Sequence, residues 1–301
     1  MDEQQAPAPP KVSVLIVSHN HAVALRRCLQ ALDRSAGRDE IEIIVADNAS
    51  RDESSTLDTV FPGATFLRMP RHFGRTKALN IASRTAAAEL LLLMSPDVEI
   101  GPDTVRTLIA TLEVEPDAVA VCPLLRSPEG DVPPQVYQLP QSGELYSLWK
   151  APDSLRPIEP AVEPPGSPAQ AVGYAPFDAL LVRKIFIRGL NYLDERFGEY
   201  GGDLELAQQI RRTGKKILLV PSATATIYPS ESDPVSSKAE SLLASDRAAG
   251  LATFAGKHFG MIPGLLLRVR FILAALGGFQ LGQLFDLVTG QKIDGSQTVE
   301  I

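Results

Sequence analysis

Acidic side chains stand directly after an apolar run near the middle of the first half of the chain. Residues 90–94 are uniformly apolar, and Ser95-Pro96 then leads into Asp97 and Glu99. A short apolar run that stops at a turn signal predicts a buried strand, as found in parallel sheets covered on both faces. Asp97 would lie just beyond the carboxyl end of that strand, where α/β sheets bind ligands, and could hold a metal, a ribose hydroxyl or a phosphate-bound cation. The alternative is that Asp97 caps a helix starting near Pro102.

Polar groups also follow two earlier apolar runs. Ser18 and Asn20 stand at the end of the run 12–18, and Asp47 follows the run 41–46. Parallel strands end on one edge of a sheet, so we expect these side chains to converge with Asp97. Asp47 could accept hydrogen bonds from a nucleobase, although an Asp-Asn-Ala-Ser segment also commonly forms an Asx turn.

Cations and one further acid complete the set of candidates. Arg75 and Lys77 precede or begin a predicted helix and either meet a diphosphate or stay solvated on the surface. Asp203 follows Gly201-Gly202 and opens another predicted helix, with Leu206 and Ile210 on its apolar stripe. Asp203 is therefore either an N-cap or, at the mouth of a helix, a general base for a hydroxyl nucleophile.

The elements that must position these groups alternate between strand and helix. Alternating strands and helices predict parallel βαβ units and an α/β fold. Strands are expected at 12–18, 41–46, 64–68, 89–94, 118–125 and 217–221, and helices at 22–36, 52–60, up to 88, 101–115 and 203–212.

Composition limits the class of protein. The 301 residues carry a formal net charge of −7, which gives no electrostatic support for a nucleic-acid partner. Only two cysteines, Cys28 and Cys122, are present, so the sequence has neither a disulfide framework nor metal-thiolate spacing, as in a reducing compartment. Residues 1–10 are acidic and rich in Pro and Ala, and we expect them to be disordered rather than a signal peptide.

Two segments depart from the regular pattern. Residues 127–170 are rich in Pro, with scattered aromatic residues, and form either a loop on the acceptor side or a floppy insertion. Residues 231–301 form a helical extension whose apolar part, 260–287, is interrupted by Arg268 and Arg270. That part is too broken for a transmembrane helix; it predicts either an interfacial helix on a membrane or a helix packed on the domain or on a partner chain.

Six motifs follow one another along the chain: Val-Ser-Val-Leu-Ile-Val-Ser-His-Asn, Ile-Ile-Val-Ala-Asp-Asn-Ala-Ser, Phe-Gly-Arg-Thr-Lys-Ala-Leu-Asn, Leu-Leu-Leu-Met-Ser-Pro-Asp-Val-Glu-Ile, Leu-Asp-Glu-Arg-Phe and Asp-Leu-Glu-Leu-Ala-Gln-Gln-Ile-Arg-Arg-Thr-Gly. In this order they resemble family 2 glycosyltransferases of the GT-A fold, in particular the rhamnosyltransferase-like branch, over residues 12–228. The resemblance implies a Rossmann-like, mostly parallel sheet flanked by helices in a domain spanning 11–230. It also implies transfer of a sugar from a nucleotide donor to a hydroxyl, with inversion.

The resemblance also implies a role for each candidate. Asp97 matches the last acid of the family's metal-binding motif and would hold Mn²⁺ or Mg²⁺ against the diphosphate. Asp203 matches the general base. The nucleotide would contact the remaining candidates, Ser18, Asn20, Asp47, Arg75, Lys77 and Asn80.

The chain departs from the family pattern at three positions. Ser95 stands where Asn is usual, Gly202 stands where an acid is usual, and no histidine follows the last strand, where Tyr228 lies. We expect a cytoplasmic enzyme, free or peripheral to the inner face of the cell membrane. It would use a glycan or lipid-linked acceptor and a sugar such as rhamnose. The alternatives are a catalytically degenerate protein with a binding or scaffolding role and, less favoured, a nucleotidyltransferase.

Overall fold

A nine-stranded sheet forms the centre of the protein in the computed structural model, which describes residues 9–150, 156–160, 167–230 and 236–297. Its strands are β1 (Val12–Ser18), β2 (Ile41–Asp47), β3 (Ala64–Arg68), β4 (Leu90–Met94), β5 (Val98–Ile100), β6 (Ala118–Arg126), β7 (Gln170–Val172), β8 (Ala179–Arg183) and β9 (Lys216–Ile227).

The sheet is parallel in its first half and mixed in its second. The strand order is β3-β2-β1-β4-β8-β6-β9-β5, with β7 pairing β9, and the strands from β3 to β4 are all parallel. The parallel pair β6 and β9 follows, while β8 runs antiparallel to both of its neighbours. The α/β class and the C-terminal helices expected from the sequence are confirmed, and the antiparallel β8 and the short strand β5 were not predicted.

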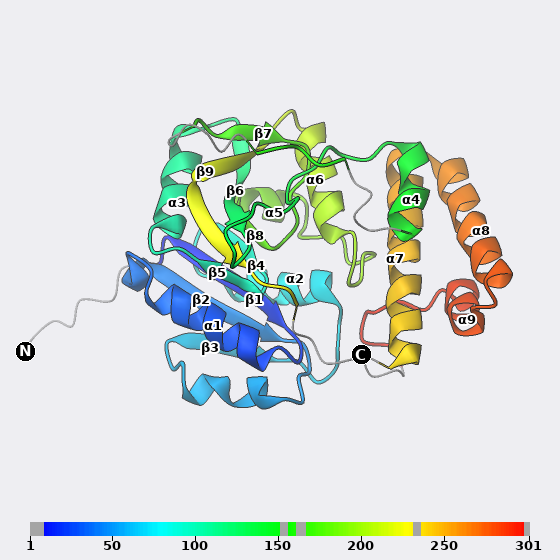
Figure 1. Ribbon diagram of the computed structural model, residues 1–301, viewed down its shortest axis with the longest axis horizontal. Coiled ribbons are helices and arrows are strands. Elements are labelled where there is room, and N and C mark those ends of the chain that lie inside the picture. The colour runs from blue at the N-terminus through cyan, green and yellow to red at the C-terminus, as the bar shows by residue number, and fades with distance from the viewer. Residues whose placement is uncertain (1–8, 151–155, 161–166, 231–235, 298–301) are drawn as a thin grey trace, which may run out of the picture.

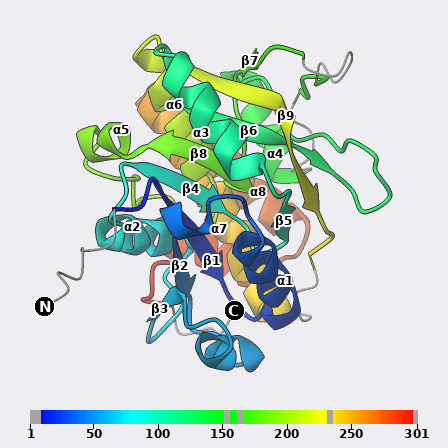
Figure 2. The same ribbon diagram turned by 90° about the vertical axis from the view of Figure 1, so that its left-hand side faces the viewer.

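Helices cover both faces of the sheet (Figures 1 and 2). One core packs α1 and α3 against side chains such as Val14 and Ile16, and the other packs α2, α6 and α7 against Leu15 and Ile44. Alternate residues of β1 thus enter opposite cores, which is why this strand needs an unbroken apolar sequence. The helices are α1 (Ala22–Asp33), α2 (Arg75–Thr85), α3 (Thr104–Val114), α4 (Leu145–Lys150), α5 (Lys184–Gly189), α6 (Gly202–Arg212), α7 (Ser237–His258), α8 (Met261–Gly277) and α9 (Leu281–Thr289), with 3₁₀ turns at Arg38–Glu40, Glu53–Thr59 and Ser142–Glu144.

The C-terminal helices share a core with the sheet. Phe254 on α7 and Phe271 on α8 are fully buried in the cluster that contains Leu204 and Leu206 of α6. Figure 1 shows α7 beside the sheet and α8 and α9 on its outer side. None of the described helices combines the length and the apolar character needed to cross a membrane.

Parts of three sequence expectations fall outside the described residues, which begin at Pro9 and omit 151–155, 161–166, 231–235 and 298–301. These are the disordered N-terminus and parts of the insertion and of the C-terminal extension. The described part of the Pro-rich insertion packs on the core through Val136, Leu145 and Leu148.

Candidate functional site

Polar side chains gather at one edge of the sheet. Ser18 pairs with Asp47, and Ile16 pairs with Met94, so β1, β2 and β4 end side by side. The antiparallel strand β8 begins at this edge, and the Ser95 backbone N–H donates to the Asp178 carbonyl at 2.9 Å. The edge therefore collects the expected polar groups and adds Asp178, which parallel strands alone would not have brought there.

The groups at the ends of β1 and β2 hold two loops together. The Asp47 carboxylate Oδ1 accepts the Ser50 backbone N–H at 2.9 Å, as in a turn, and the Asn20 side-chain carbonyl accepts the Arg51 N–H at 2.8 Å. Asn20 has a φ of 53°, a left-handed conformation that asparagine tolerates better than most residues. The Ser18 hydroxyl is buried and has no hydrogen-bond partner within the described part of the chain, so it can serve a ligand.

The three candidates on α2 point to different places. The Arg75 guanidinium donates to the Phe177 carbonyl at 2.9 Å and lies 3.8 Å from the Asp178 carboxylate. Lys77 lies 4.4 Å from the centre of the Phe73 ring and donates to the backbone carbonyl of Asp294.

Asn80 lies on the buried side of α2. Its side chain accepts the Leu193 N–H and donates to the Leu193 carbonyl, each at 2.9 Å, and also reaches Glu195. Of the three α2 candidates, Arg75 alone enters the pocket described below.

Asp97 offers a carboxylate oxygen suited to a cation. Its Oδ1 is buried and makes no hydrogen bond within the described residues, while Ser95 Oγ lies 3.4 Å from Oδ2. Asp97 precedes β5, and the residue at the N-cap of α3 is Asp103, so the helix-capping alternative for Asp97 is wrong.

Tyr228 directly follows β9 and lies next to Asp97. Its backbone N–H donates to the Asp97 carbonyl at 3.0 Å, and its hydroxyl donates to Glu99 at 3.1 Å. The Arg27 guanidinium covers its ring at 3.5 Å. Tyr228 therefore holds the backbone around Asp97.

These residues fit a metal ion only in part. No cluster of three or more His, Cys, Asp and Glu side chains suited to a metal ion exists in residues 9–150, 156–160, 167–230 and 236–297. Mg²⁺ commonly binds through one or two carboxylates together with substrate phosphates. The unpartnered oxygen of Asp97 fits that mode, in which a nucleotide completes the coordination.

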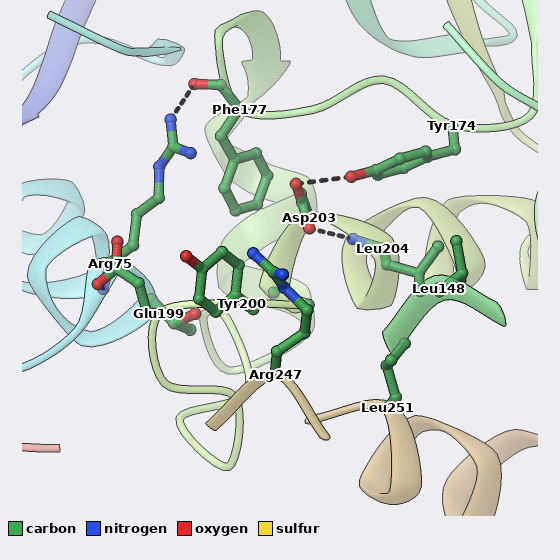
Figure 3. Close-up of a pocket in the computed structure, with 13 residues that line it drawn as sticks. Arg75, Leu148, Tyr174, Phe177, Glu199, Tyr200, Asp203, Leu204, Arg247 and Leu251 are labelled. Atoms are coloured by element: carbon green, nitrogen blue, oxygen red, sulfur yellow. Dashed lines mark hydrogen bonds between the residues drawn. The ribbon is translucent and has the colours of Figure 1, made fainter. Parts of the chain in front are cut away.

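A cavity of about 160 Å³ lies between α2, α4, α6 and α7. Arg75 stands on one side, Asp203 lies near the middle, and Arg247 of α7 stands beside Tyr200 with its guanidinium carbon 4.2 Å from the ring centre (Figure 3). The lining also includes Thr76, Leu148, Tyr174, Phe177, Glu199, Gly201, Gly202, Leu204 and Leu251.

Asp203 is fixed by two hydrogen bonds. Its Oδ2 accepts the Tyr174 hydroxyl and its Oδ1 accepts the Leu204 backbone N–H, both at 2.8 Å. The N-cap of α6 is Gly201, with a φ of 93°, so the N-cap alternative for Asp203 is wrong. Burial and the Asp203 charge raise the pKa of Tyr174 well above its usual value, which keeps this phenol a hydrogen-bond donor.

Asp178 connects the pocket to the strand edge. Burial raises the pKa of Asp178; the charges of Asp203 and Asp97 raise it further, while Arg75 opposes the shift. Arg75, which lines the pocket, lies 3.8 Å from the Asp178 carboxylate, and the Asp178 carbonyl accepts the N–H of Ser95, two residues before Asp97. Arg75 and Asp178 thus link the pocket that contains the candidate base to the strand edge that carries the candidate metal ligand.

Glu199 is a second, half-buried acid in the pocket and was not predicted. Its carboxylate accepts the Arg75 backbone N–H at 3.0 Å and lies 3.8 Å from His72. Burial raises its pKa to about 7, and the Asp246 charge contributes, while Arg75 opposes the shift. Glu199 therefore accepts the first N–H of α2, and burial favours its protonated form.

Packing explains the acid missing at position 202. A Cβ atom added at Gly202 would stand 2.5 Å from the Thr76 hydroxyl, so Thr76 fills the space that a side chain would need. Glu205 lies two residues after Asp203 and faces away from the cavity, with Oε2 2.5 Å from His258. Asp203 is therefore the acid of α6 that lines the pocket.

Some missed residues had a signal in the sequence. Asp178 directly precedes the apolar run 179–182, so recognition that this strand is antiparallel would have placed it at the same edge. Arg247 and Glu199 had no such signal, since contacts between distant parts of the chain bring them to the pocket.

The comparisons with known proteins agree on one family. The model of the family described as glycosyl transferase family 2 matches residues 13–177, just over half of the chain. A relative from Mycobacterium tuberculosis, an N-acetylglucosaminyl-diphospho-decaprenol L-rhamnosyltransferase, is 26% identical over 249 residues, which cover 74% of this chain and 78% of the relative.

Solved glycosyltransferases share the fold. The structure of S. aureus TarS 1-349 in complex with UDP-GlcNAc has a TM-score of 0.54 at 15% identity, covering 83% of this chain and 72% of that one. The mannosyltransferase PcManGT from Pyrobaculum calidifontis, in complex with GDP-Man and Mn²⁺, has a TM-score of 0.51 at 17% identity, covering 96% and 83%. The chain therefore belongs to glycosyl transferase family 2 and is a glycosyltransferase.

Proposed function

We propose that this protein transfers a sugar from a nucleotide-sugar donor to an acceptor hydroxyl, with inversion, in the synthesis of a cell-surface polysaccharide or glycolipid. The observation that carries the proposal is the position of Asp203, held by Tyr174 in a pocket that also contains Arg75 and Arg247. A carboxylate fixed in this way beside cations suits proton removal next to an anionic substrate.

Asp203 acts as the general base in this proposal. Each of its oxygens accepts one hydrogen bond and keeps a further lone pair for the acceptor hydroxyl. As the proton moves to Asp203, the acceptor oxygen bonds to the anomeric carbon on the face opposite the leaving group. The bond from that carbon to the diphosphate oxygen breaks, the configuration inverts, and the nucleoside diphosphate carries away the negative charge.

The donor occupies the strand edge. Ser18 and Asp47 contact the nucleoside, Asn20 shapes their loop, and the Arg75 guanidinium faces the diphosphate. We place Lys77 and Asn80 in supporting positions, because their contacts run to Asp294 and Leu193. Asp97 would hold a divalent cation, which supplies positive charge for the diphosphate when bound.

The relative suggests a donor and an acceptor to test. It is described as an L-rhamnosyltransferase that acts on N-acetylglucosaminyl-diphospho-decaprenol. We therefore propose a deoxyhexose donor such as a rhamnose nucleotide and a lipid-linked acceptor sugar.

The test is transfer by purified protein from a panel of nucleotide sugars, with calorimetric titration of the matching nucleoside diphosphate. Asp203→Asn should lower the rate constant of transfer by a factor of roughly 10²–10⁴, the range for general-base catalysis, and leave nucleotide affinity nearly unchanged. Glu240→Gln, at an exposed acid in the first turn of α7, is the control and should behave as wild type.

The alternative is a degenerate transferase that binds without reaction. Nucleotide binding without transfer from any donor, or transfer that survives Asp203→Asn, would contradict the proposed role of Asp203. A product with retained anomeric configuration would exclude the single displacement.

A further inference from the structure

The outer side of α8 and α9 is apolar and uncovered. Eleven of the fifteen exposed large hydrophobic side chains in the described part of the chain lie between Met261 and Val288. We name these eleven residues the α8–α9 face. Met261, Ile262, Phe279 and Leu281 are 82%, 68%, 86% and 70% exposed. Soluble proteins rarely present an apolar patch this extensive unless it binds something.

This face is distinct from the side of α8 that packs on the protein. Gly264, Leu267, Phe271 and Ala275 are buried and recur at helical spacing. At 100° per residue, the exposed apolar residues of α8 are centred roughly 150° around the helix axis from that buried stripe. The helix therefore has two apolar sides, and packing on α7 accounts for one of them.

The exposed charges on α8 are both positive, and the acid of α9, Asp286, is only 8% exposed. Arg268 and Arg270 fall between the two apolar sides of α8, one at each border. Arg268 donates to the Leu287 carbonyl at 3.2 Å and Arg270 lies 3.5 Å over the Tyr146 ring, and neither forms an ion pair with a described residue. Residues 247–285 contain four Lys or Arg and no Asp or Glu, in a chain whose net charge is −7.

We propose that the α8–α9 face docks the protein onto an anionic lipid bilayer. An apolar stripe bordered by cations is the pattern of a helix that lies in the membrane interface. Its apolar side chains enter the acyl boundary, and its Arg stems extend to the phosphates. An anionic bilayer would attract the cations beside the face and would repel the acidic remainder of the chain.

A second copy of this chain fits the face less well. In a twofold symmetric contact the same patch meets itself, so Arg268 and Arg270 of both copies would be brought into one interface. The headgroups of an anionic bilayer have the charge opposite to that of Arg268 and Arg270, and a fluid bilayer needs no matching surface shape.

The buried side of α8, opposite the α8–α9 face, lies near the proposed acceptor pocket. Trp149 and Tyr146 of α4 pack against Phe271 of α8, with ring centres 4.8 and 5.9 Å away, and Leu148 of the same helix lines the pocket. If the proposed function holds, docking would bring the pocket close to a lipid-linked acceptor. The docking itself does not depend on that activity.

The test is sedimentation of the full chain with vesicles of phosphatidylcholine alone or mixed equally with phosphatidylglycerol. The key variant is Ile262→Glu and its matched control is Ile185→Glu. Each isoleucine is the second residue of a helix, and their exposures are 68% and 67%. Circular dichroism and thermal unfolding confirm that both variants fold.

We expect wild type and Ile185→Glu to bind the anionic vesicles, and Ile262→Glu to bind them about tenfold more weakly or worse, as for loss of one inserted side chain. Arg268→Gln should weaken binding about fivefold and reduce its salt dependence. Equal binding to both vesicle types would refute the proposal that the face binds an anionic bilayer. No vesicle binding, together with a dimer in sedimentation velocity that Ile262→Glu dissociates, would assign the face to a second copy.

Discussion

Glu199 should make the stability of this protein depend on pH in an unusual direction for an acid. Its pKa is raised from 4.5 to about 7, chiefly by burial. Between these values the unfolded chain has lost the proton that the folded protein keeps. Stability is therefore fully retained below pH 4.5 and falls as the pH rises through about 7.

The size of this effect follows from the shift. A shift of 2.5 pKa units corresponds to about 3 kcal/mol. The side chain keeps 25% of its surface exposed although its carboxyl group lies deep among neighbouring atoms, so solvent reduces the effect. We expect Glu199 to lower the free energy of unfolding by about 1–3 kcal/mol between pH 4.5 and 8.

The assay is urea denaturation of wild type and Glu199→Gln across this pH range. The glutamine carbonyl can still accept the Arg75 N–H that Glu199 accepts at 3.0 Å, so the cap on α2 survives while the titration is removed. The stability of Glu199→Gln relative to wild type should therefore rise by about 1–3 kcal/mol from pH 4.5 to pH 8. Glu129→Gln, at an exposed loop residue, is the control and should track wild type.

Parallel pH profiles for wild type and Glu199→Gln would refute the reasoning. That result would mean that water or a local rearrangement solvates the carboxylate as well as the unfolded chain does. A profile with the opposite sign would mean that Arg75 stabilises the charge more than burial opposes it.

Three other predictions concern packing, positioning and donor binding. Gly202→Ala should destabilise the protein by about 1–3 kcal/mol through the contact with Thr76, and Thr76→Ala should remove most of that cost; additive costs in denaturant unfolding would contradict the clash. Asp246 accepts the backbone N–H groups of Glu199, Tyr200 and Ile293. Asp246→Asn should therefore lower the free energy of unfolding by about 1–3 kcal/mol and lower kcat more than nucleotide affinity. Unchanged stability would show that Asp246 does not hold these segments together. Asp97→Asn should weaken nucleoside diphosphate binding in the presence of Mn²⁺ by at least about tenfold and have little effect without metal, and calorimetry showing equal losses in both conditions would exclude a metal ligand.

Much of the parallel half of the fold could be predicted from the sequence. Strands buried on both faces must be apolar along their whole length, so the apolar runs predict the strands Val12–Ser18 and Leu90–Met94. The first polar residues after each run mark where the strand ends. The convergence of Ser18, Asp47 and Asp97 at one edge then follows from parallel pairing. The apolar faces of the helices could also be predicted from residue spacing, as with Leu206 and Ile210 of α6.

The direction of β8 could not be predicted, because an apolar run does not encode which way a buried strand points. Its antiparallel pairing with β4 decides that Asp178 joins the site. The alternative that Asp203 caps α6 is excluded for a local reason: the helix begins at Gly202, after Gly201 in a left-handed conformation.

The sequence by itself determined the family, the strand edge and the acids that end there, because local apolar patterns and motif order carry that information. The tertiary structure alone decided what surrounds Asp203. Arg247 and Leu251 of α7 reach the pocket across more than forty residues of sequence, Thr76 closes the space beside Gly202, and burial shifts the pKa of Glu199. Desolvation and steric exclusion depend on neighbours distant in sequence, so these properties arise only when the chain has folded.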